Sequence, residues 1–334
     1  MAKRMDGKMI EVKNLSKRYG DTFAVKDASF TINRGEILGF LGRNGAGKST
    51  TMNIITGYIS ASAGQVTLDG FDILDEPREA KRHIGYLPEV PPLYPDMTVE
   101  EYLRFVCAIK DVRRARVRAH VEDVCDLTRI GEVRKRLIKN LSKGYKQRVG
   151  LAQALIGNPD VIILDEPTAG LDPGQIIEIR RLIQTLGQDH TVVLSSHILH
   201  EVEDICERVI IIHAGRIIAQ DTLSHLAHSV AENPQLRVRI AGPQEAVLGA
   251  LRTLPGVLSV REAGQKEADS HDFLVEASKD VDVRQPLIQA VLRLDCALLM
   301  LRPMDVELED IFLRLTGEEE GNGGEGKNAG NMEA

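Results

Sequence analysis

The sequence predicts an α/β fold in which a mostly parallel sheet covered by helices is followed by a small α+β domain. Three observations support this prediction. The chain has 334 residues and 43% apolar content, and a single hydrophobic core stops growing near about 250 residues. The short apolar runs 161–164 and 191–194 flank a helical pattern, and such alternation is typical of parallel sheets. A polar break at 231–234 then separates a second region.

The first region opens with strand-like runs at 9–12, 30–32 and 37–41, which turn residues interrupt. After Gly47 the pattern becomes helical. Residues 98–130 carry apolar positions at helical spacing with many charges between them. An amphipathic helix is expected at 174–186, between the two buried runs.

The second region predicts alternating short strands and helices, followed by a last helix at 305–315. In order, we expect a strand at 235–241, a helix at 243–254, strands at 256–262 and 272–277, a helix at 282–294 and a strand at 297–302. This order fits a ferredoxin-like βαββαβ unit. We therefore expect an accessory domain at 235–316. Residues 317–334 hold five Glu and one Lys with little apolar content, which predicts a disordered acidic tail.

Composition excludes several classes of protein. No apolar run approaches the roughly 20 residues of a membrane-spanning helix, and no apolar segment follows the N-terminal Lys3 and Arg4. We therefore expect a cytoplasmic chain. The four cysteines lie far apart, unlike those of zinc sites or disulfide scaffolds. The net charge is −7, yet residues 101–150 carry fourteen Lys and Arg against six Asp and Glu.

A glycine-rich loop follows the run at 37–41 and opens a helix, which is the context in which a phosphate-binding loop is meaningful. Its backbone N–H groups and the helix N-terminus favour phosphate oxygens. Lys48 is expected to reach the β- and γ-phosphates, and the Ser49 hydroxyl is the natural Mg²⁺ ligand. A chance turn with a lysine is the alternative. The loop is Gly42, Arg43, Asn44, Gly45, Ala46, Gly47, Lys48 and Ser49, with Thr50 next.

Two carboxylates end the apolar run at 161–164. We predict that Asp165 lies beside the metal and that Glu166 polarises an attacking water. Phosphate binding alone would not need the second carboxylate, so the pair predicts hydrolysis. As an alternative, both residues cap the turn before Pro167.

With these motifs, residues 9 to about 228 resemble the ATP-binding cassette (ABC) family. The most specific element is Leu141-Ser142-Lys143-Gly144-Tyr145, which resembles the family signature LSGGQ. The resemblance also implies a D-loop at 169–172, a switch histidine at His197 that contacts the γ-phosphate, and adenine stacking by Tyr19. It implies a nucleotide-binding domain at 9–230 with a helical subdomain at about 90–141.

The sequence departs from the family pattern at two motifs. Lys143 and Tyr145 replace glycine and glutamine of the signature, while Ser142 and Gly144 remain as expected γ-phosphate donors. Glu89 stands where the family has the Q-loop glutamine, and its oxygens can still bind Mg²⁺ or water. Both variants resemble an export-type branch with separately encoded permeases, which includes gliding-motility and multidrug systems.

By this resemblance, Ser142 of one copy completes the site that holds Lys48 of another, so two cassettes close on two ATP molecules. A homodimer with ATP and Mg²⁺, docked on a multi-spanning permease at the inner face of the cell membrane, is the expected assembly. The helical subdomain is the expected docking surface. Its basic run, which includes Lys110 and Arg113, either faces anionic lipid or is a solvated helix face.

The rival prediction is a soluble ABC ATPase that acts on nucleic acid or ribosomes without a permease. The acidic net charge lacks the broad basic surface of nucleic-acid-binding proteins, so no nucleic-acid partner is expected. A nonhydrolytic binding protein is a third alternative, which the intact Lys48, Asp165, Glu166 and His197 oppose.

Overall fold

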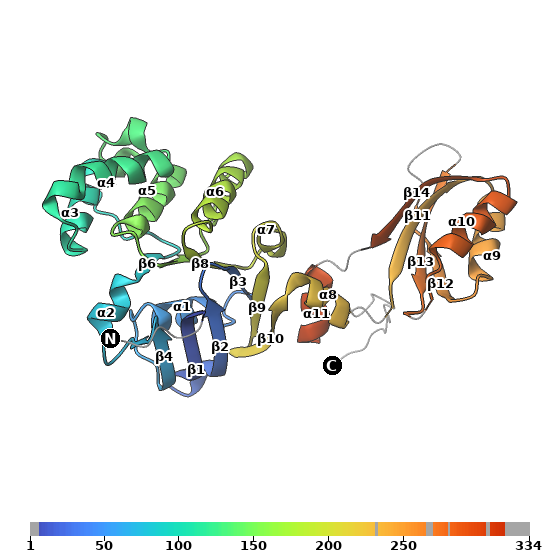
Figure 1. Ribbon diagram of the computed structural model, residues 1–334, viewed down its shortest axis with the longest axis horizontal. Helices are drawn as coiled ribbons and strands as arrows, with labels where there is room; N and C mark the ends of the chain where they lie inside the picture. Colours follow the sequence, from blue (N-terminus) through green and yellow to red (C-terminus); the bar gives the residue numbers. More distant parts are fainter. Residues whose placement is uncertain (1–6, 231–232, 265–269, 280, 305–307, 318–334) are drawn as a thin grey trace, which may run out of the picture. The chain divides into compact units, whose positions relative to one another are not determined.

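The computed structural model describes residues 7–230, 233–264, 270–279, 281–304 and 308–317. The chain forms two compact units, 1–223 and 224–334 (Figure 1). The predicted acidic tail lies outside the described residues from 318 onward.

A six-stranded sheet organises the first unit. Its strands are β3 (Ile37–Leu41), β6 (Ile84–Leu87), β7 (Val161–Asp165), β8 (Thr191–Ser196), β9 (Arg208–His213) and β10 (Arg216–Thr222). The strand order is β10-β9-β3-β8-β7-β6, and only the edge strand β10 pairs antiparallel. Strands β7 and β8 are buried along their whole length. Burial on both faces explains why these two strands read as continuous apolar runs.

Parallel pairing brings the carboxyl ends of the central strands to one edge of this sheet. Leu41 at the end of β3 lies opposite Ser196 of β8, and Ser195 lies opposite Asp165 of β7. The loops that leave these ends therefore meet in space. This edge positions the candidate site.

A second, antiparallel sheet covers part of the same core. Its strands are β1 (Lys8–Tyr19), β2 (Thr22–Asn33), β4 (Ala63–Leu68) and β5 (Phe71–Asp72), in the order β2-β1-β4-β5. The runs predicted at 9–12 and 30–32 pair with each other at the end of the long β1–β2 hairpin that lies away from its turn, where Ile10, Val12, Phe30 and Ile32 are buried. Helix α1 (Lys48–Ile55) contributes Met52 and Ile55 to the core that both sheets share.

Helices complete the first unit. They are α2 (Pro77–Arg82), α3 (Val99–Ile109), α4 (Arg114–Leu127), α5 (Lys143–Leu155), α6 (Pro173–Leu186) and α7 (Leu199–Glu203), with 3₁₀ turns η1 (Gly131–Val133) and η2 (Ile138–Asn140). Thr98 and Glu101 form a reciprocal capping box at the start of α3. Helices α3, α4 and α5 pack on one another. Helices α3 and α4 span most of the segment predicted to be helical at 98–130.

The second unit contains a four-stranded antiparallel sheet in the order β12-β13-β11-β14. Its elements are α8 (Leu223–Val230), β11 (Gln235–Ala241), α9 (Gln244–Arg252), β12 (Val257–Glu262), β13 (Ser270–Ala277), α10 (Arg284–Arg293), β14 (Ala297–Met304) and α11 (Leu308–Thr316). Helices α9 and α10 bury Val247, Leu251 and Leu287 against Phe273 of the sheet. On β13, the carboxylate of Asp272 is fully buried.

Candidate nucleotide site

The loop between β3 and α1 has the backbone shape of a phosphate cradle. Gly47 caps α1 with φ +111°, and a Cβ on this residue would lie 2.4 Å from the carbonyl oxygen of Ala24. Glycine is therefore required there by both conformation and space. The Lys48 ammonium folds back over the loop and donates to the carbonyl oxygen of Gly42 at 2.7 Å.

A cavity of about 400 Å³ lies over this loop. It collects residues from the loop, from Glu89, and from the segments after β7 and β8. Its lining is Ala24, Arg43, Asn44, Gly45, Gly47, Lys48, Ser49, Thr50, Glu89, Glu166, Ala169 and His197. Most of the predicted nucleotide-binding residues thus surround one cavity. Gly42 supplies a carbonyl beneath it, and Ala46 packs into the core.

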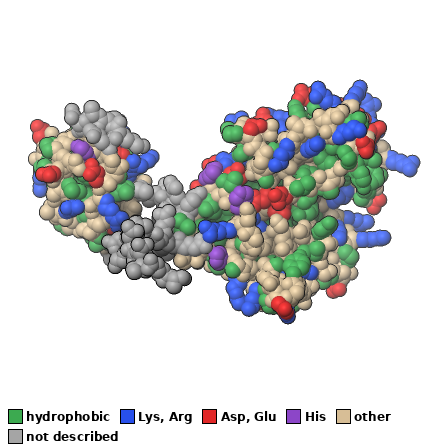
Figure 2. Space-filling model, turned by 180° about the vertical axis from the view of Figure 1, so that it is seen from behind, with side chains coloured by type: hydrophobic (Ala, Val, Ile, Leu, Met, Phe, Trp, Pro, Cys, Tyr) green, Lys and Arg blue, Asp and Glu red, His purple; other side chains and the backbone are tan. Residues whose placement is uncertain are grey.

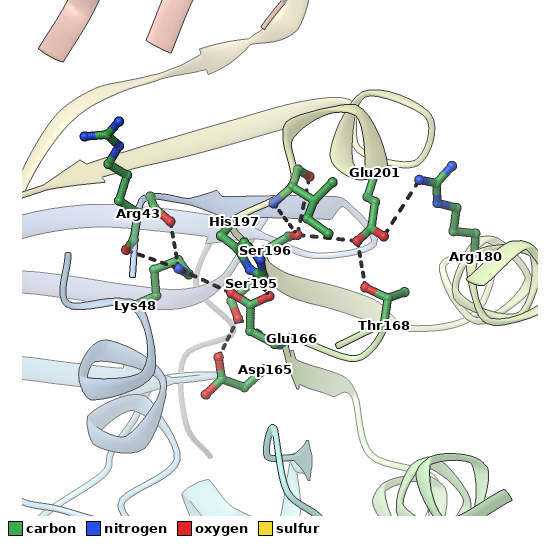
Figure 3. A network of polar contacts seen from close by, with 12 residues as sticks. Arg43, Lys48, Asp165, Glu166, Thr168, Arg180, Ser195, Ser196, His197 and Glu201 are labelled. Atoms are coloured by element: carbon green, nitrogen blue, oxygen red, sulfur yellow. Dashed lines mark hydrogen bonds and ion pairs between the residues drawn. The ribbon is translucent and has the colours of Figure 1, made fainter. Parts of the chain in front are cut away.

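Glu166 lies between two nitrogen groups in this cavity (Figure 3). Its Oε1 is 3.3 Å from the Lys48 Nζ, and its Oε2 is 2.8 Å from the His197 Nδ1. Lys48 is only 5% exposed and Glu166 is buried as well. Contacts at both oxygens fix the orientation of this carboxylate in the cavity.

The backbone at Glu166 adopts the left-handed region, with φ +49°. Its N–H donates to the Ser195 carbonyl oxygen at 3.2 Å and lies 3.1 Å from the Ser195 Oγ. Non-glycine residues rarely adopt this region, and they do so often at active sites. Strand β8 therefore supports the conformation that turns Glu166 into the cavity.

Oxygen ligands suited to Mg²⁺ line a neighbouring cavity of about 800 Å³, namely Ser49, Glu89 and Asp165. The Asp165 Oδ1 accepts from the Ser195 Oγ at 2.5 Å. Among the described residues no group of three or more His, Cys, Asp or Glu could hold a metal by itself. The hydroxyl of Ser49 and the carboxylates of Glu89 and Asp165 are donors of the kind that Mg²⁺ takes, usually one or two carboxylates together with substrate phosphates.

Tyr86 lines this second cavity beside Asp165. Its hydroxyl donates to the Asn53 Oδ1 at 3.0 Å. Burial, and next the negative charge of Asp165, raise the pKa of Tyr86. The phenol therefore stays neutral as a hydrogen-bond donor at neutral pH.

Besides Gly42, Ala46 and Asp165, three further predicted site residues do not line the 400 Å³ cavity, namely Tyr19, Ser142 and Gly144. Tyr19 is 52% exposed at the end of β1, with the Lys17 ammonium 5.2 Å from its ring centroid. Ser142 is exposed and caps α5, where its Oγ accepts from the Tyr145 N–H at 3.4 Å. Gly144 is buried close to the Gln175 side chain.

The residues of the predicted basic run have two kinds of surroundings: Lys110 pairs with the backbone, whereas the arginines that follow it are exposed. Lys110 donates to the Ile84 carbonyl oxygen at 2.7 Å, and burial lowers its pKa. Arg113, Arg114 and Arg116 are exposed, and Figure 2 shows Lys and Arg side chains projecting at the α3–α4 end of the first unit. Lys110 therefore serves the packing of the helical segment.

Sequence reasoning missed several residues of the site. Ala24 and Ala169 line the cavity through small side chains, which carry no chemical signal in a sequence. Ser195 precedes His197 by two residues and is not among the predicted site residues. A hydroxyl at the end of a strand that pairs with the strand of Asp165 is the signal that identifies its role.

Fold and loop geometry together define a P-loop nucleotide-binding cassette. The family described as ABC transporter matches residues 25–169. The linearmycin resistance ATP-binding protein of Bacillus subtilis is 33% identical over 312 residues, covering 92% of this chain and 98% of that protein. The Nod factor export ATP-binding protein I of Rhizobium etli is 33% identical over 324 residues, covering 95% and 98%.

Solved structures agree with these relatives. The first unit resembles a dimeric bacterial ABC transporter cassette with a TM-score of 0.59 and 28% identity, over 64% of this chain and 98% of that one. A cassette in a post-hydrolysis state, bound to ADP and phosphate, has a TM-score of 0.59 and 27% identity over the same shares.

The chain belongs to the family of ABC transporter ATP-binding proteins. It is an ATPase that serves as the ATP-binding subunit of an ABC transporter. The prediction of family and of the cassette fold is thereby confirmed, and the rival without a transporter is not supported. Within the described residues, no helix has the length and apolar character needed to cross a membrane.

Proposed function

We propose that two copies of this chain bind two Mg²⁺-ATP between them and drive export through a separately encoded permease in the cell membrane. The observation that supports this most is the position of Glu166 between Lys48 and His197 in one cavity. An ATP-driven cycle needs a group that binds phosphate, a base and a group that senses the γ-phosphate. In this proposal Lys48 binds phosphate, Glu166 is the base and His197 senses the γ-phosphate.

Each side chain has a definite task in this proposal. Lys48 moves from Glu166 to the β- and γ-phosphates when ATP binds. The freed carboxylate of Glu166 then polarises the attacking water, and His197 contacts the γ-phosphate and holds that water in line. Backbone N–H groups from Arg43 to Ser49 complete the phosphate contacts.

Mg²⁺ is the proposed metal, held by the Ser49 hydroxyl, the Asp165 carboxylate and, directly or through water, Glu89. Support comes from the shared cavity of these oxygens and from the hydrogen bond of Ser195 to Asp165. When bound, the ion neutralises charge that develops on the phosphate oxygens. Glu89 adds negative charge where the family has an amide, which favours a divalent cation.

The second copy supplies Ser142 and Gly144 in this proposal. Ser142 is exposed and does not line the nucleotide cavity of its own chain, so a phosphate contact requires another subunit. ATP then bridges the two copies, and hydrolysis removes the bridge. Tyr19 lies outside the described cavity, and an adenine that extends beyond the phosphate loop is the contact we propose for it.

The direction of transport rests on the relatives, whose names concern antibiotic resistance and Nod factor export. Attachment to the permease through the helical segment between Glu89 and Leu141 places the chain at the inner membrane face. Exposed arginines of that segment have the charge that anionic lipid attracts.

Affinity purification tests this proposal. A tagged Glu166→Gln chain, isolated from detergent-solubilised membranes with ATP present, is expected to hold the closed pair of copies and its permease. Mass spectrometry identifies what is recovered, and size-exclusion chromatography with light scattering measures the number of copies. Lys48→Ala is the matched control, because it removes the phosphate contact without changing the hydrolytic base.

A multi-spanning membrane protein recovered with Glu166→Gln supports the permease. A pair of copies that light scattering detects for Glu166→Gln but not for Lys48→Ala supports ATP-dependent pairing. Recovery of ribosomal or nucleic-acid-associated proteins with no membrane protein would contradict the proposal. A monomeric Glu166→Gln chain in saturating ATP would contradict the pairing alone.

A further inference from the structure

A further buried carboxylate, Glu201, lies near Glu166 and His197, which are called the hydrolytic pair below. Glu201 belongs to α7, four residues after His197, and is only 3% exposed. Glutamate is almost never buried to this extent unless its charge is paired or hydrogen-bonded. The partners of Glu201 therefore indicate what it does.

The two partners of one Glu201 oxygen come from the two segments that carry the hydrolytic pair (Figure 3). The Thr168 Oγ1 donates to the Oε2 of Glu201 at 2.6 Å, and the Ser196 Oγ lies 3.5 Å from the same oxygen. Thr168 follows Glu166 by two residues, and Ser196 directly precedes His197. A single oxygen thus connects the segment after β7 with the end of β8.

The cation nearest to Glu201 is shared with another carboxylate. The Arg180 Nη2 is 4.0 Å from the Glu201 Oε1, whereas the Arg180 Nη1 donates to the exposed Asp204 at 2.6 Å. The hydrogen bond from Thr168, at 2.6 Å, is shorter than the contacts of the buried carboxylate with Ser196 and Arg180, and it compensates for lost hydration.

Glu201 does not line the 400 Å³ cavity, and its hydrogen-bond partners are Thr168 and Ser196. Thr168 directly precedes Ala169, which does line that cavity. We infer that Glu201 is a positioning residue, which through Thr168 holds the segment of Glu166 against the segment of His197. The 2.8 Å contact between Glu166 and His197 depends on this link. The inference rests on ATP hydrolysis by the family to which the chain belongs.

The test compares substitutions of the link in the full-length chain. Thr168→Val removes the hydroxyl with little change in shape, and it is expected to lower the kcat of ATP hydrolysis about tenfold, because small misplacements of catalytic groups are costly. The KM for ATP is expected to stay within about twofold, since the phosphate loop is not touched. Thr168→Ser keeps the hydroxyl and should retain most of the activity.

Glu201→Ala provides the second arm. Combined with Thr168→Val, it should lower kcat hardly more than the worse single substitution, because both remove the same link. Asp204→Asn is the matched control, since Asp204 also pairs with Arg180 but is exposed and is not part of the link from Thr168 through Glu201 to Ser196. The kcat of this variant should stay unchanged. Thermal unfolding of every variant shows whether a loss of rate reflects a loss of fold.

A wild-type kcat in Thr168→Val, an equal loss in Thr168→Ser, or fully multiplicative losses in the double variant would each overturn the inference. If Glu201→Ala does not fold, the contrast between Val and Ser at Thr168 still decides the matter, because both side chains are small and uncharged.

Discussion

At the scale of single residues, Ser195 orients two residues of the proposed site, Glu166 and Asp165. Glu166 keeps a left-handed backbone because its N–H bonds to Ser195. The same serine donates to Asp165. One hydroxyl on β8 thus supports both the proposed metal ligand and the proposed base, and this double role leads to a prediction.

Replacing Ser195 with alanine should weaken the use of Mg²⁺. Loss of a hydrogen bond to a metal-binding side chain typically lowers metal affinity 10- to 100-fold, so we expect the Mg²⁺ concentration for half-maximal ATPase activity to rise about tenfold. Titration of Mg²⁺ at saturating ATP measures this. Thr191→Val is the control, because Thr191 lies at the other end of β8 and its Oγ1 accepts from Gly35. The prediction is wrong if Ser195→Ala and wild type show the same Mg²⁺ dependence.

At the scale of elements, the turn from β3 into α1 decides whether phosphate can bind. Gly45 and Gly47 both have positive φ, at +80° and +111°. They differ in surroundings: a Cβ at Gly45 would meet nothing within 4 Å, whereas one at Gly47 would lie 2.4 Å from the Ala24 carbonyl oxygen. Substitution of Gly45 therefore tests the effect of backbone conformation alone, whereas substitution of Gly47 tests backbone conformation together with a close contact.

We expect Gly47→Ala to weaken ATP binding far more than Gly45→Ala does. A left-handed alanine costs about 1–3 kcal/mol at either position, but only Gly47→Ala also displaces the loop against β2. Fluorescent nucleotide titration should give at least about a tenfold larger Kd for Gly47→Ala than for Gly45→Ala. Circular dichroism must show that both variants fold. Equal affinities in the two variants would show that the contact at Ala24 is unimportant.

At the scale of the whole molecule, the chain consists of two compact units with separate cores. The second core has a charged cluster at its sheet, where Asp272 accepts from Arg239 at 2.6 Å and from Arg237 at 2.9 Å. The Arg239 guanidinium, and next that of Arg237, hold the pKa of Asp272 below its ordinary value. Breaking such a pair leaves buried charge without compensation.

Asp272→Asn should therefore destabilise the second unit by about 3 kcal/mol at pH 7. Because the folded pKa is lowered, the stabilisation by the carboxylate is present above about pH 4 and is lost as the pH falls through the folded pKa. The difference in unfolding free energy between wild type and variant should shrink in acid accordingly. Urea unfolding at several pH values measures it.

Asp282→Asn is the matched control for this experiment, because Asp282 also pairs with an arginine but is exposed. Surface pairs contribute about 0–1 kcal/mol, so its effect should be small. An equally small loss of unfolding free energy in Asp272→Asn would contradict the structural account. A difference in unfolding free energy between wild type and Asp272→Asn that stays constant down to pH 2 would contradict it as well.

Much of the fold and most of the site follow from local patterns. The sequence predicted the phosphate loop, Asp165 and Glu166 from their positions after apolar strands, and it predicted His197 from the resemblance to the family; the structure brings Lys48, Glu166 and His197 to one cavity. The elements of 235–304 occur in the structure in the order predicted. Strands β1 and β2 extend toward their turn well beyond the predicted runs, because their pairing continues to Tyr19 and Thr22 through several register shifts, which interrupt a regular apolar pattern.

The sequence by itself determined the class of chemistry, since the glycine-rich loop at 42–49 and the paired carboxylates at 165–166 are each local patterns that predict a chemical role. Only the tertiary structure decided which groups support them. Ser195, Thr168 and Glu201 lie up to 33 residues apart, and parallel pairing of β7 with β8 brings their segments together. Such contacts have no local pattern, because the side chains that meet lie on segments that follow two neighbouring strands, β7 and β8, and a long crossover separates these strands along the chain.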